Sequence, residues 1–287
     1  MSNMFDQMLS KYEIRTKDEK LNAIHEVMQQ ITLAGLFRGG FFNHAAFYGG
    51  TCLRIFHKLP RFSEDMDFSL LKKNDSFNLE NYFDAIYSEF KALGREISID
   101  KKKKQTESHI ESAFLKDNTD IYNLKFQTER TVKIKIEVDK NPPLKFNSEN
   151  KILLHPFSFM TRCFTLSKLY AGKMHAFVYR KWRGRVKGRD WYDFEWYVKN
   201  NVALDFNHLR ARIAQSENID IKTITNEHVL QQLKTKIQNT DINKVKADVV
   251  PFIKNSNELK IWSTDYFLQL ADMIQFLPEK LSQLSNN

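Results

Sequence analysis

The sequence predicts an α+β protein in which a small mixed β-sheet flanked by helices is followed by a helical C-terminal region. Two segments before residue 140 alternate polar and apolar side chains, as half-buried strands do. After about residue 160 the apolar residues recur instead at helical spacing. With 42% hydrophobic residues, 9 Gly and 6 Pro, the chain of 287 residues can bury a core. We expect one unit in residues 1–155 and a helical unit in residues 156–287 that completes the cleft of the first.

The first predicted elements form a helix, a strand, a glycine turn and a short helix. Apolar residues at three-and-four spacing predict an amphipathic helix over residues 21–36, which ends near Gly39-Gly40. A short apolar strand, residues 45–48, leads into Gly49-Gly50. We expect the next helix to start at Thr51, because threonine is a favourable N-cap residue.

Two alternating segments place carboxylates on the polar faces of strands. In residues 65–70, Asp65 and Asp67 alternate with apolar residues, so both carboxylates project from one face. Residues 132–139 alternate in the same way, with Glu137 opposite the apolar face. These two segments are the predicted strands that could carry chemistry.

The remaining predicted elements are mostly helical. Residues 78–94 have helical spacing, and a strand begins at residues 97–99. The sequence Asn141-Pro142-Pro143 ends the predicted strand over residues 132–139, since proline has no N–H to donate to a neighbouring strand. The helices predicted after this point cover residues 164–182, 190–199, 206–216, 224–238, 241–252 and 260–277.

Composition restricts the class of protein and of partner. The formal net charge of +9 and the pI of about 9.3 favour a polyanionic partner such as nucleic acid. The 2 cysteines, Cys52 and Cys163, are too far apart for a zinc knuckle and too few for a disulfide scaffold. No stretch approaches the roughly 20 apolar residues that span a bilayer. We therefore expect a cytoplasmic protein with no membrane partner.

The glycine turn and the acidic strands together predict a site for phosphates and divalent cations. Carboxylates at alternate positions of a strand, such as Asp65 and Asp67, lie about 6 to 7 Å apart and can share an ion. Magnesium prefers oxygen ligands and is commonly bound by one or two carboxylates plus substrate phosphates. Glu137 is placed to add a third carboxylate from a neighbouring strand. Gly49-Gly50, before a helix start, offers backbone N–H groups to phosphates.

Two blocks of the sequence resemble a known family. Residues 47–54, FYGGTCLR, and residues 61–69, RFSEDMDFS, closely fit the glycine and acidic block of the AbiEii/AbiGii toxin family. Lys173 and residues 185–193, RVKGRDWYD, are similar to that family's second block. This family is part of the DNA-polymerase-beta-like nucleotidyltransferases, and the resemblance implies a nucleotidyltransferase core in the N-terminal unit.

The resemblance implies roles for the residues of the first block. Asp65 and Asp67 would hold two Mg²⁺ ions, with Mn²⁺ as an alternative. The third carboxylate would be Glu137, although Asp139 lies on the same face and remains an alternative. The triphosphate of an NTP would lie on the loop formed by Gly49, Gly50 and Thr51.

The second block adds a cation and two carboxylates. Lys173 would pair with the triphosphate, as the family's lysine does. Asp190 and Asp193 lie at the start of the next predicted helix, and we expect Asp190 to be functional and Asp193 structural. The basic stretch of residues 180–189 suits phosphate contact and base stacking, and equally a solvated loop. A second run, Lys101 to Lys104, is explained more simply as a disordered or solvated turn than as a binding site for the acceptor.

The predicted reaction is transfer of a nucleoside monophosphate from an NTP to a hydroxyl, with release of pyrophosphate. Glu137 would help to deprotonate the attacking hydroxyl. The resemblance implies RNA as acceptor, specifically the tRNA 3′ end, in the toxin of a toxin-antitoxin or phage-defence system with a separate antitoxin. A small molecule or a protein as acceptor, and an inactive RNA-binding module, remain alternatives. A metal-dependent nuclease fits poorly, because Asp139 stands where such a site needs lysine.

Overall fold

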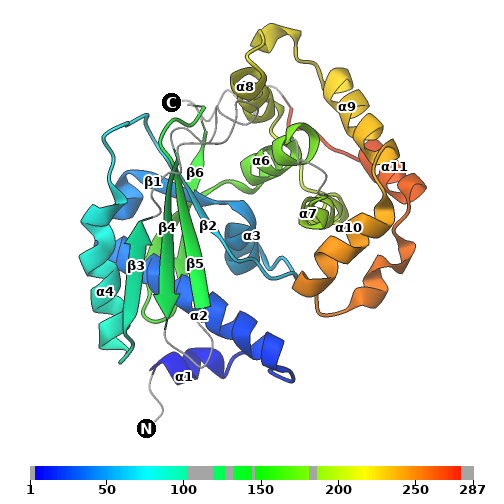
Figure 1. Cartoon of the computed structure of the whole chain (residues 1–287). Coiled ribbons are helices and arrows are strands. Elements are labelled where there is room, and N and C mark those ends of the chain that lie inside the picture. Colours follow the sequence, from blue (N-terminus) through cyan, green and yellow to red (C-terminus); the bar gives the residue numbers. More distant parts are fainter. Residues whose placement is uncertain (1–3, 102–118, 127–131, 144–145, 181–185, 279–287) are drawn as a thin grey trace. The chain divides into compact units, whose positions relative to one another are not determined.

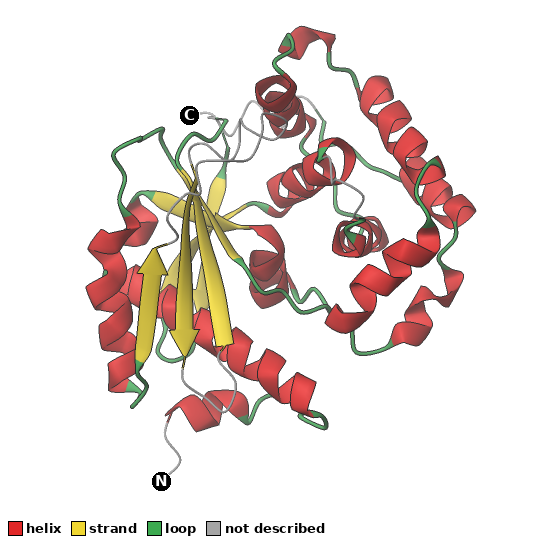
Figure 2. Cartoon of the chain, viewed as in Figure 1, coloured by secondary structure: helices red, strands yellow, loops and turns green. Residues whose placement is uncertain are grey.

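The computed structural model describes residues 4–101, 119–126, 132–143, 146–180 and 186–278 (Figures 1 and 2). For residues 100, 101 and 119–126 only the backbone is described. Most of the lysine run at residues 101–104 and the centre of the basic stretch at residues 180–189 lie outside these ranges, so the hypotheses about them stay untested. The described helices include none long and apolar enough to cross a membrane.

The chain divides into two compact units that are interleaved along the sequence. Unit 1 consists of Met1–Cys52, Ser63–Leu144 and Ser148–Cys163. Unit 2 consists of Leu53–Phe62, Lys145–Asn147 and Phe164–Asn287. The division differs from a single boundary near residue 155 because two short segments before that residue belong to the helical unit.

Unit 1 is built on a seven-stranded mixed sheet with the strand order β3-β4-β5-β2-β1-β7-β6. The pairing of β2 with β1 is antiparallel, whereas β2 with β5 and β1 with β7 are parallel, which confirms the predicted mixed sheet. The strands are β1 (Ala45–Tyr48), β2 (Met66–Leu70), β3 (Ile97–Lys101), β4 (Thr119–Phe126), β5 (Val132–Asp139), β6 (Ser148–Leu153) and β7 (Phe159–Phe164).

The predicted strand over residues 132–139 is confirmed as β5. Its apolar residues have 0–2% of their surface exposed, and they are Val132, Ile134, Ile136 and Val138. Strand β2 differs in two respects from the prediction of a half-buried strand over residues 65–70. It begins at Met66, so Asp65 precedes it, and Ser69 is buried along with the apolar residues. The central position of β2, between β5 and β1, explains this burial.

The helices of unit 1 are α1 (Met4–Leu9), α2 (Lys17–Arg38) and α4 (Phe83–Ala92), together with the start of α3 (Gly49–His57). Helix α2 begins at a capping box formed by Thr16 and Glu19. It packs closely on α4, because a Cβ added to Gly35 would lie 2.7 Å from Ile86 Cα. The predicted helix over residues 78–94 is present as a 3₁₀ turn, Leu79–Tyr82, followed by α4.

Unit 2 contains the helices predicted after residue 160. They are α6 (Leu166–Tyr179), α7 (Gly188–Lys199), α8 (Phe206–Glu217), α9 (Asn226–Gln238), α10 (Ile242–Val249) and α11 (Thr264–Asp272). Helix α6 packs on α7, α8 and α9, and α7 packs on α10 and α11. The predicted helix over residues 260–277 is shorter than expected: the 3₁₀ segment Ser256–Ile261 precedes it, and Ser263 caps α11.

Aromatic side chains form much of the core of unit 2. Tyr170 of α6 stacks on Tyr197 of α7, with 4.2 Å between ring centroids. Trp191 packs against Phe177 and meets Phe267 of α11 edge to face. These contacts hold α7 between α6 and α11 and fix the direction in which its polar residues point.

Candidate active site

Gly49 and Asp67 lie directly against each other in unit 1. Tyr48 of β1 pairs with Asp67 of β2, so Gly49 emerges from β1 beside the aspartate. The φ of Gly49 is +82°, a left-handed conformation that favours glycine. An added Cβ there would lie 2.1 Å from Asp67 Oδ2, so any larger residue would displace the Asp67 carboxylate. The first glycine of the pair is thus required by both conformation and space.

Thr51 holds the backbone that leads into β2. It is fully buried, and its hydroxyl donates a short hydrogen bond to the backbone carbonyl of Asp65. Helix α3 already begins at Gly49, so the prediction that Thr51 caps it was wrong. The left-handed glycine lets the helix start two residues earlier, and the threonine side chain ties this turn to the acidic strand.

The strand register distinguishes the two candidates for the third carboxylate. Asp67 pairs with Glu137 across the parallel strands β2 and β5, whereas Asp139 lies opposite Ser69. Glu137 is half-buried, and its carboxylate lies 2.5 Å from Lys135 Nζ. Asp139 is buried and accepts a hydrogen bond from the backbone N–H of Asn141 at 3.0 Å. The geometry favours Glu137, because it stands beside Asp67 and Asp139 is occupied with the end of its own strand.

The donor atoms of this site fit magnesium by type. Asp65, Asp67 and Glu137 offer only carboxylate oxygens, which are the ligands Mg²⁺ prefers. Among the described residues, no three His, Cys, Asp or Glu side chains are gathered closely enough to hold an ion. Glu137 is paired with Lys135, 2.5 Å away.

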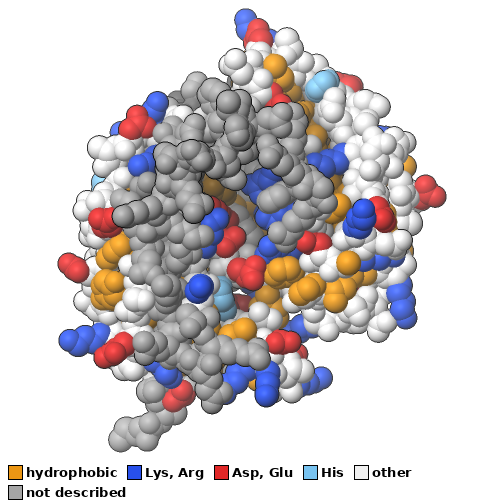
Figure 3. Space-filling model, in the orientation of Figure 1, with side chains coloured by type: hydrophobic (Ala, Val, Ile, Leu, Met, Phe, Trp, Pro, Cys, Tyr) orange, Lys and Arg blue, Asp and Glu red, His pale blue; other side chains and the backbone are white. Residues whose placement is uncertain are grey.

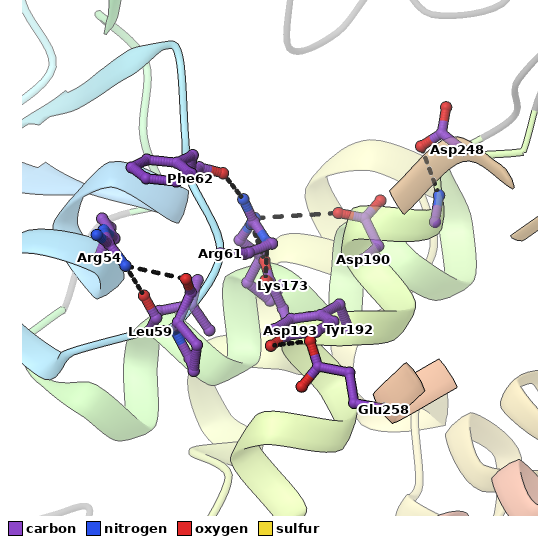
Figure 4. A network of polar contacts seen from close by, with 12 residues as sticks. Arg54, Leu59, Arg61, Phe62, Lys173, Asp190, Tyr192, Asp193, Asp248 and Glu258 are labelled. Carbon is purple, nitrogen blue, oxygen red and sulfur yellow. Dashed lines mark hydrogen bonds and ion pairs between the residues drawn. The ribbon is translucent and has the colours of Figure 1, made fainter. Parts of the chain in front are cut away.

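Unit 2 contains a second charged cluster, around Lys173 of α6 (Figure 4). Lys173 Nζ lies 2.7 Å from Asp193 Oδ2 and 3.9 Å from Asp190 Oδ1, both on α7. Arg61 donates from Nε and Nη2 to the two oxygens of Asp193, each at 2.6 Å. Two cations thus share the carboxylate of Asp193, and Lys173 also faces Asp190.

The charges of this cluster compensate one another. Burial opposes ionisation of Asp193, but Arg61 and Lys173 outweigh it and hold the pKa of this carboxyl below its usual value. Burial lowers the pKa of Arg61, yet the charge of Asp193 and the hydrogen bonds to it raise that pKa overall. The Lys173 side chain is the most accessible of the four, at 18% exposed against 0–5% for the others. It is the member that a ligand could reach.

Sequence reasoning missed Arg61 as a part of this cluster. The residue stands in the quoted block RFSEDMDFS, which was the available signal, but its partner Asp193 is far along the chain. The segment that carries it is built into unit 2: Phe62 N–H donates to the carbonyl of Phe252 at 2.8 Å. Arg54 donates to the carbonyl of Leu59 at 3.0 Å, which shapes the turn before Arg61 (Figure 4).

A family model described as the nucleotidyl transferase AbiEii toxin of a type IV toxin-antitoxin system matches residues 31–281. The chain belongs to the AbiEii family. Family membership confirms the resemblance seen in the two sequence blocks and makes the protein a nucleotidyltransferase of the toxin class. No curated protein matches the sequence.

Solved structures share the fold of this AbiEii protein at low sequence identity. A protein of H. pylori described as a candidate nucleotidyltransferase is 19% identical, with a TM-score of 0.52 over 92% of this chain and 97% of that one. JHP933 from Helicobacter pylori is 18% identical, with a TM-score of 0.53 over 92% and 94%. MenT4, a nucleotidyltransferase toxin from Mycobacterium tuberculosis, is 14% identical, with a TM-score of 0.53 over 98% and 91%. The α+β fold predicted for this AbiEii chain is thereby confirmed.

The predicted site residues of the AbiEii chain fall into one group in each unit. Gly49, Thr51, Asp65, Asp67 and Glu137 meet around β1, β2 and β5 in unit 1. In unit 2, Lys173 lies with Asp190 and Asp193 on α6 and α7. Asp193 pairs with both Arg61 and Lys173. The structural role expected of Asp193 and the catalytic roles of the other residues stay predictions.

Proposed function

We propose that this AbiEii toxin is a magnesium-dependent enzyme that transfers a nucleoside monophosphate from an NTP to a hydroxyl of RNA, at the tRNA 3′ end. The observation that carries the proposal is the register of Asp67 with Glu137, beside a left-handed glycine in close contact with Asp67. A purely structural site would not need two carboxylates level with each other against a left-handed glycine.

In the proposed mechanism the residues of unit 1 bind phosphate and accept a proton. Backbone N–H groups at Gly49 and Gly50, at the start of α3, would bind the triphosphate. Asp65, Asp67 and Glu137 would hold Mg²⁺, or Mn²⁺ in its place. The ion, when bound, supplies charge that stabilises the attacking and leaving oxygens. Glu137 would then accept the proton of the attacking hydroxyl, which requires it to release Lys135.

The residues of unit 2 would bind the triphosphate by charge. Arg61 occupies both oxygens of Asp193, so this carboxylate does not by itself neutralise Lys173. Lys173 is the more exposed cation of the cluster, with 18% of its side chain exposed against 2% for Arg61, and its ammonium group would donate to a phosphate. Asp190 is placed 3.9 Å from the same ammonium group and would orient it.

The acceptor and the partner are proposed from charge and family. The net charge of +9 favours a polyanion, and basic and acidic side chains are interspersed over the described face in Figure 3. The family is one of toxin-antitoxin systems, so a cognate antitoxin is expected as a partner. A small-molecule or protein acceptor is the alternative, because the same kind of metal site serves any hydroxyl.

Incubation with each labelled NTP, Mg²⁺ and total cellular RNA tests the proposal. We expect the label to appear on tRNA. The label should be lost when the RNA 3′ ends are oxidised with periodate, and also when the Asp67→Asn variant is used in place of the parent enzyme. Labelled small molecules or proteins with unlabelled RNA would overturn the RNA acceptor while keeping the reaction. Full transfer by Asp67→Asn would overturn the mechanism itself.

A further inference from the structure

Unit 2 contains a cavity of about 680 Å³ that the proposed mechanism does not use. It is bordered by the end of α6, the start of α7 and one face of α9. Its volume falls in the range of roughly 300–1,000 Å³ that small-ligand sites occupy. Asp190 forms part of its wall, so the cavity adjoins the Lys173 cluster within the same unit.

One wall of the cavity is a polar stripe along α9 that continues just past its end. Three of its residues recur at every fourth position of the helix, His228, Gln232 and Lys236, and Thr240 follows beyond Gln238, the last residue of α9. The neighbouring face of α9 is apolar and buried, with Val229, Leu233 and Ile237 at 0–1% exposed. His228 and Gln232 are exposed, whereas Lys236 and Thr240 are half-buried, so the stripe runs from an open end into the unit. Packing explains the apolar face of α9 but not this polar one.

The other wall is apolar and comes from α6 and α7. Phe177 and Trp191 line it, and both are almost completely buried. An apolar wall opposite a row of hydrogen-bonding side chains is the usual composition of a site for an organic ring with polar substituents. The cavity therefore offers more than an ion-binding point.

The charged residues at the cavity favour a negative ligand. Arg180, Lys187 and Lys236 line it, against the carboxylates of Asp190 and Glu217. Burial lowers the pKa of Lys187 to about 8, Asp190 opposes this change, and the like charges of Lys173, Arg180 and Arg189 add to it. A phosphate at this place would offset the repulsion among these cations.

Two backbone carbonyls fix the direction of the Lys236 side chain. Its ammonium group donates to the backbone carbonyls of Val178 and Arg180, each at 3.2 Å, at the end of α6. Burial lowers the pKa of Lys236, and the charge of Asp190 opposes this change. An ammonium has three donors, and among the described residues Lys236 uses two of them on these carbonyls, which leaves one for a ligand.

We infer that this cavity binds one nucleotide of a single-stranded RNA acceptor. Its phosphate would lie near Lys236 and Lys187, and its base or ribose along His228 and Gln232. The inference rests on the proposed function for the identity of the acceptor, because a free nucleotide has the same chemistry. Single-stranded nucleic acid is commonly bound by such a combination of basic groups and apolar or aromatic surface.

Binding of a short fluorescein-labelled RNA, measured by anisotropy without NTP or Mg²⁺, tests the inference. Each lost phosphate contact lowers the slope of log affinity against log salt by about 0.7 for a single strand. We expect Lys236→Gln to reduce the magnitude of this slope by about 0.7, and Lys236→Arg, which keeps the charge, to retain the slope of the parent. Lys234→Gln is the matched control, because Lys234 is paired with Asp272 and does not line the cavity.

A second variant keeps the inference testable if Lys236→Gln does not fold. The double substitution His228→Ala/Gln232→Ala changes exposed residues and is expected to weaken RNA binding several-fold with an unchanged salt slope. An unchanged affinity and slope in both variants would overturn the inference. Equal weakening by unlabelled CMP and by RNA competitors would assign the cavity to a free nucleotide instead. Since the assay needs no nucleotide transfer, failure of the proposed reaction would leave its outcome readable.

Discussion

The charged residues of the two units are held in place by different means. In unit 1 the backbone places them: strand register sets Asp67 beside Glu137, and the left-handed Gly49 brings the loop against Asp67. In unit 2 side chains place one another, since Arg61 and Lys173 both pair with the buried Asp193. A change to a carboxylate should therefore affect chemistry in unit 1 and folding in unit 2.

The largest effect on folding is expected for Asp193→Ala in unit 2. The change leaves Arg61 buried at 1% exposed without the carboxylate that holds it. Removing one partner of a buried ion pair costs about 3–5 kcal/mol. Urea unfolding followed by tryptophan fluorescence measures the free energy of unfolding of unit 2, because all 4 tryptophans lie beyond residue 164.

Asp190→Ala is the matched control for this prediction. Asp190 is also buried on α7, but its contact with Lys173 is the longer one, at 3.9 Å against 2.7 Å. We expect a clearly smaller loss of unfolding free energy than for Asp193→Ala. Equal losses would mean that the Arg61 pair contributes nothing beyond burial.

The next effect concerns chemistry in unit 1. Glu137→Gln should lower the rate of nucleotide transfer by about 100-fold or more, because a general base contributes roughly 10²–10⁴-fold. Asp139→Asn should stay within about 10-fold of the parent, since this residue pairs with Ser69 and not with Asp67. Single-turnover transfer with labelled NTP measures both. The opposite order of the two variants would identify Asp139 as the third carboxylate.

A smaller effect on folding is expected where the backbone itself is changed. Gly49→Ala places a methyl group 2.1 Å from Asp67 Oδ2 at a φ of +82°, which should cost about 1–3 kcal/mol and displace the carboxylate. Gly172→Ala is the control, because a Cβ there meets nothing within 4 Å and α6 should gain up to about 1 kcal/mol. Circular-dichroism melting and NTP binding compare the two. Intact NTP binding by Gly49→Ala would show that the close contact has no part in the site.

The difference between placement by the backbone in unit 1 and placement by side chains in unit 2 also explains what could be predicted from sequence. Strand β5 was predictable because its residues alternate, and with β2 as its neighbour this also gave Glu137. Strands β6 and β7 were not predicted: β6 lies at the edge of the sheet and has no buried residue that would give an alternating signal. The pairing of Arg61 with Asp193 spans 132 residues, and no local pattern reports a contact at that distance.

The smallest effect expected is the dependence of the Asp193 pair on pH. Its folded pKa lies below the unfolded value of about 3.8, because Arg61 and Lys173 favour the charged form. The contribution of the pair is therefore complete above pH 4 and is lost as pH falls through the lower, folded pKa. The difference in unfolding free energy between the parent and Asp193→Asn should be constant from neutral pH to about pH 4 and should narrow below it. Urea unfolding at a series of pH values measures this difference, and a gap that narrowed already near pH 6 would show that groups other than Asp193 dominate the coupling.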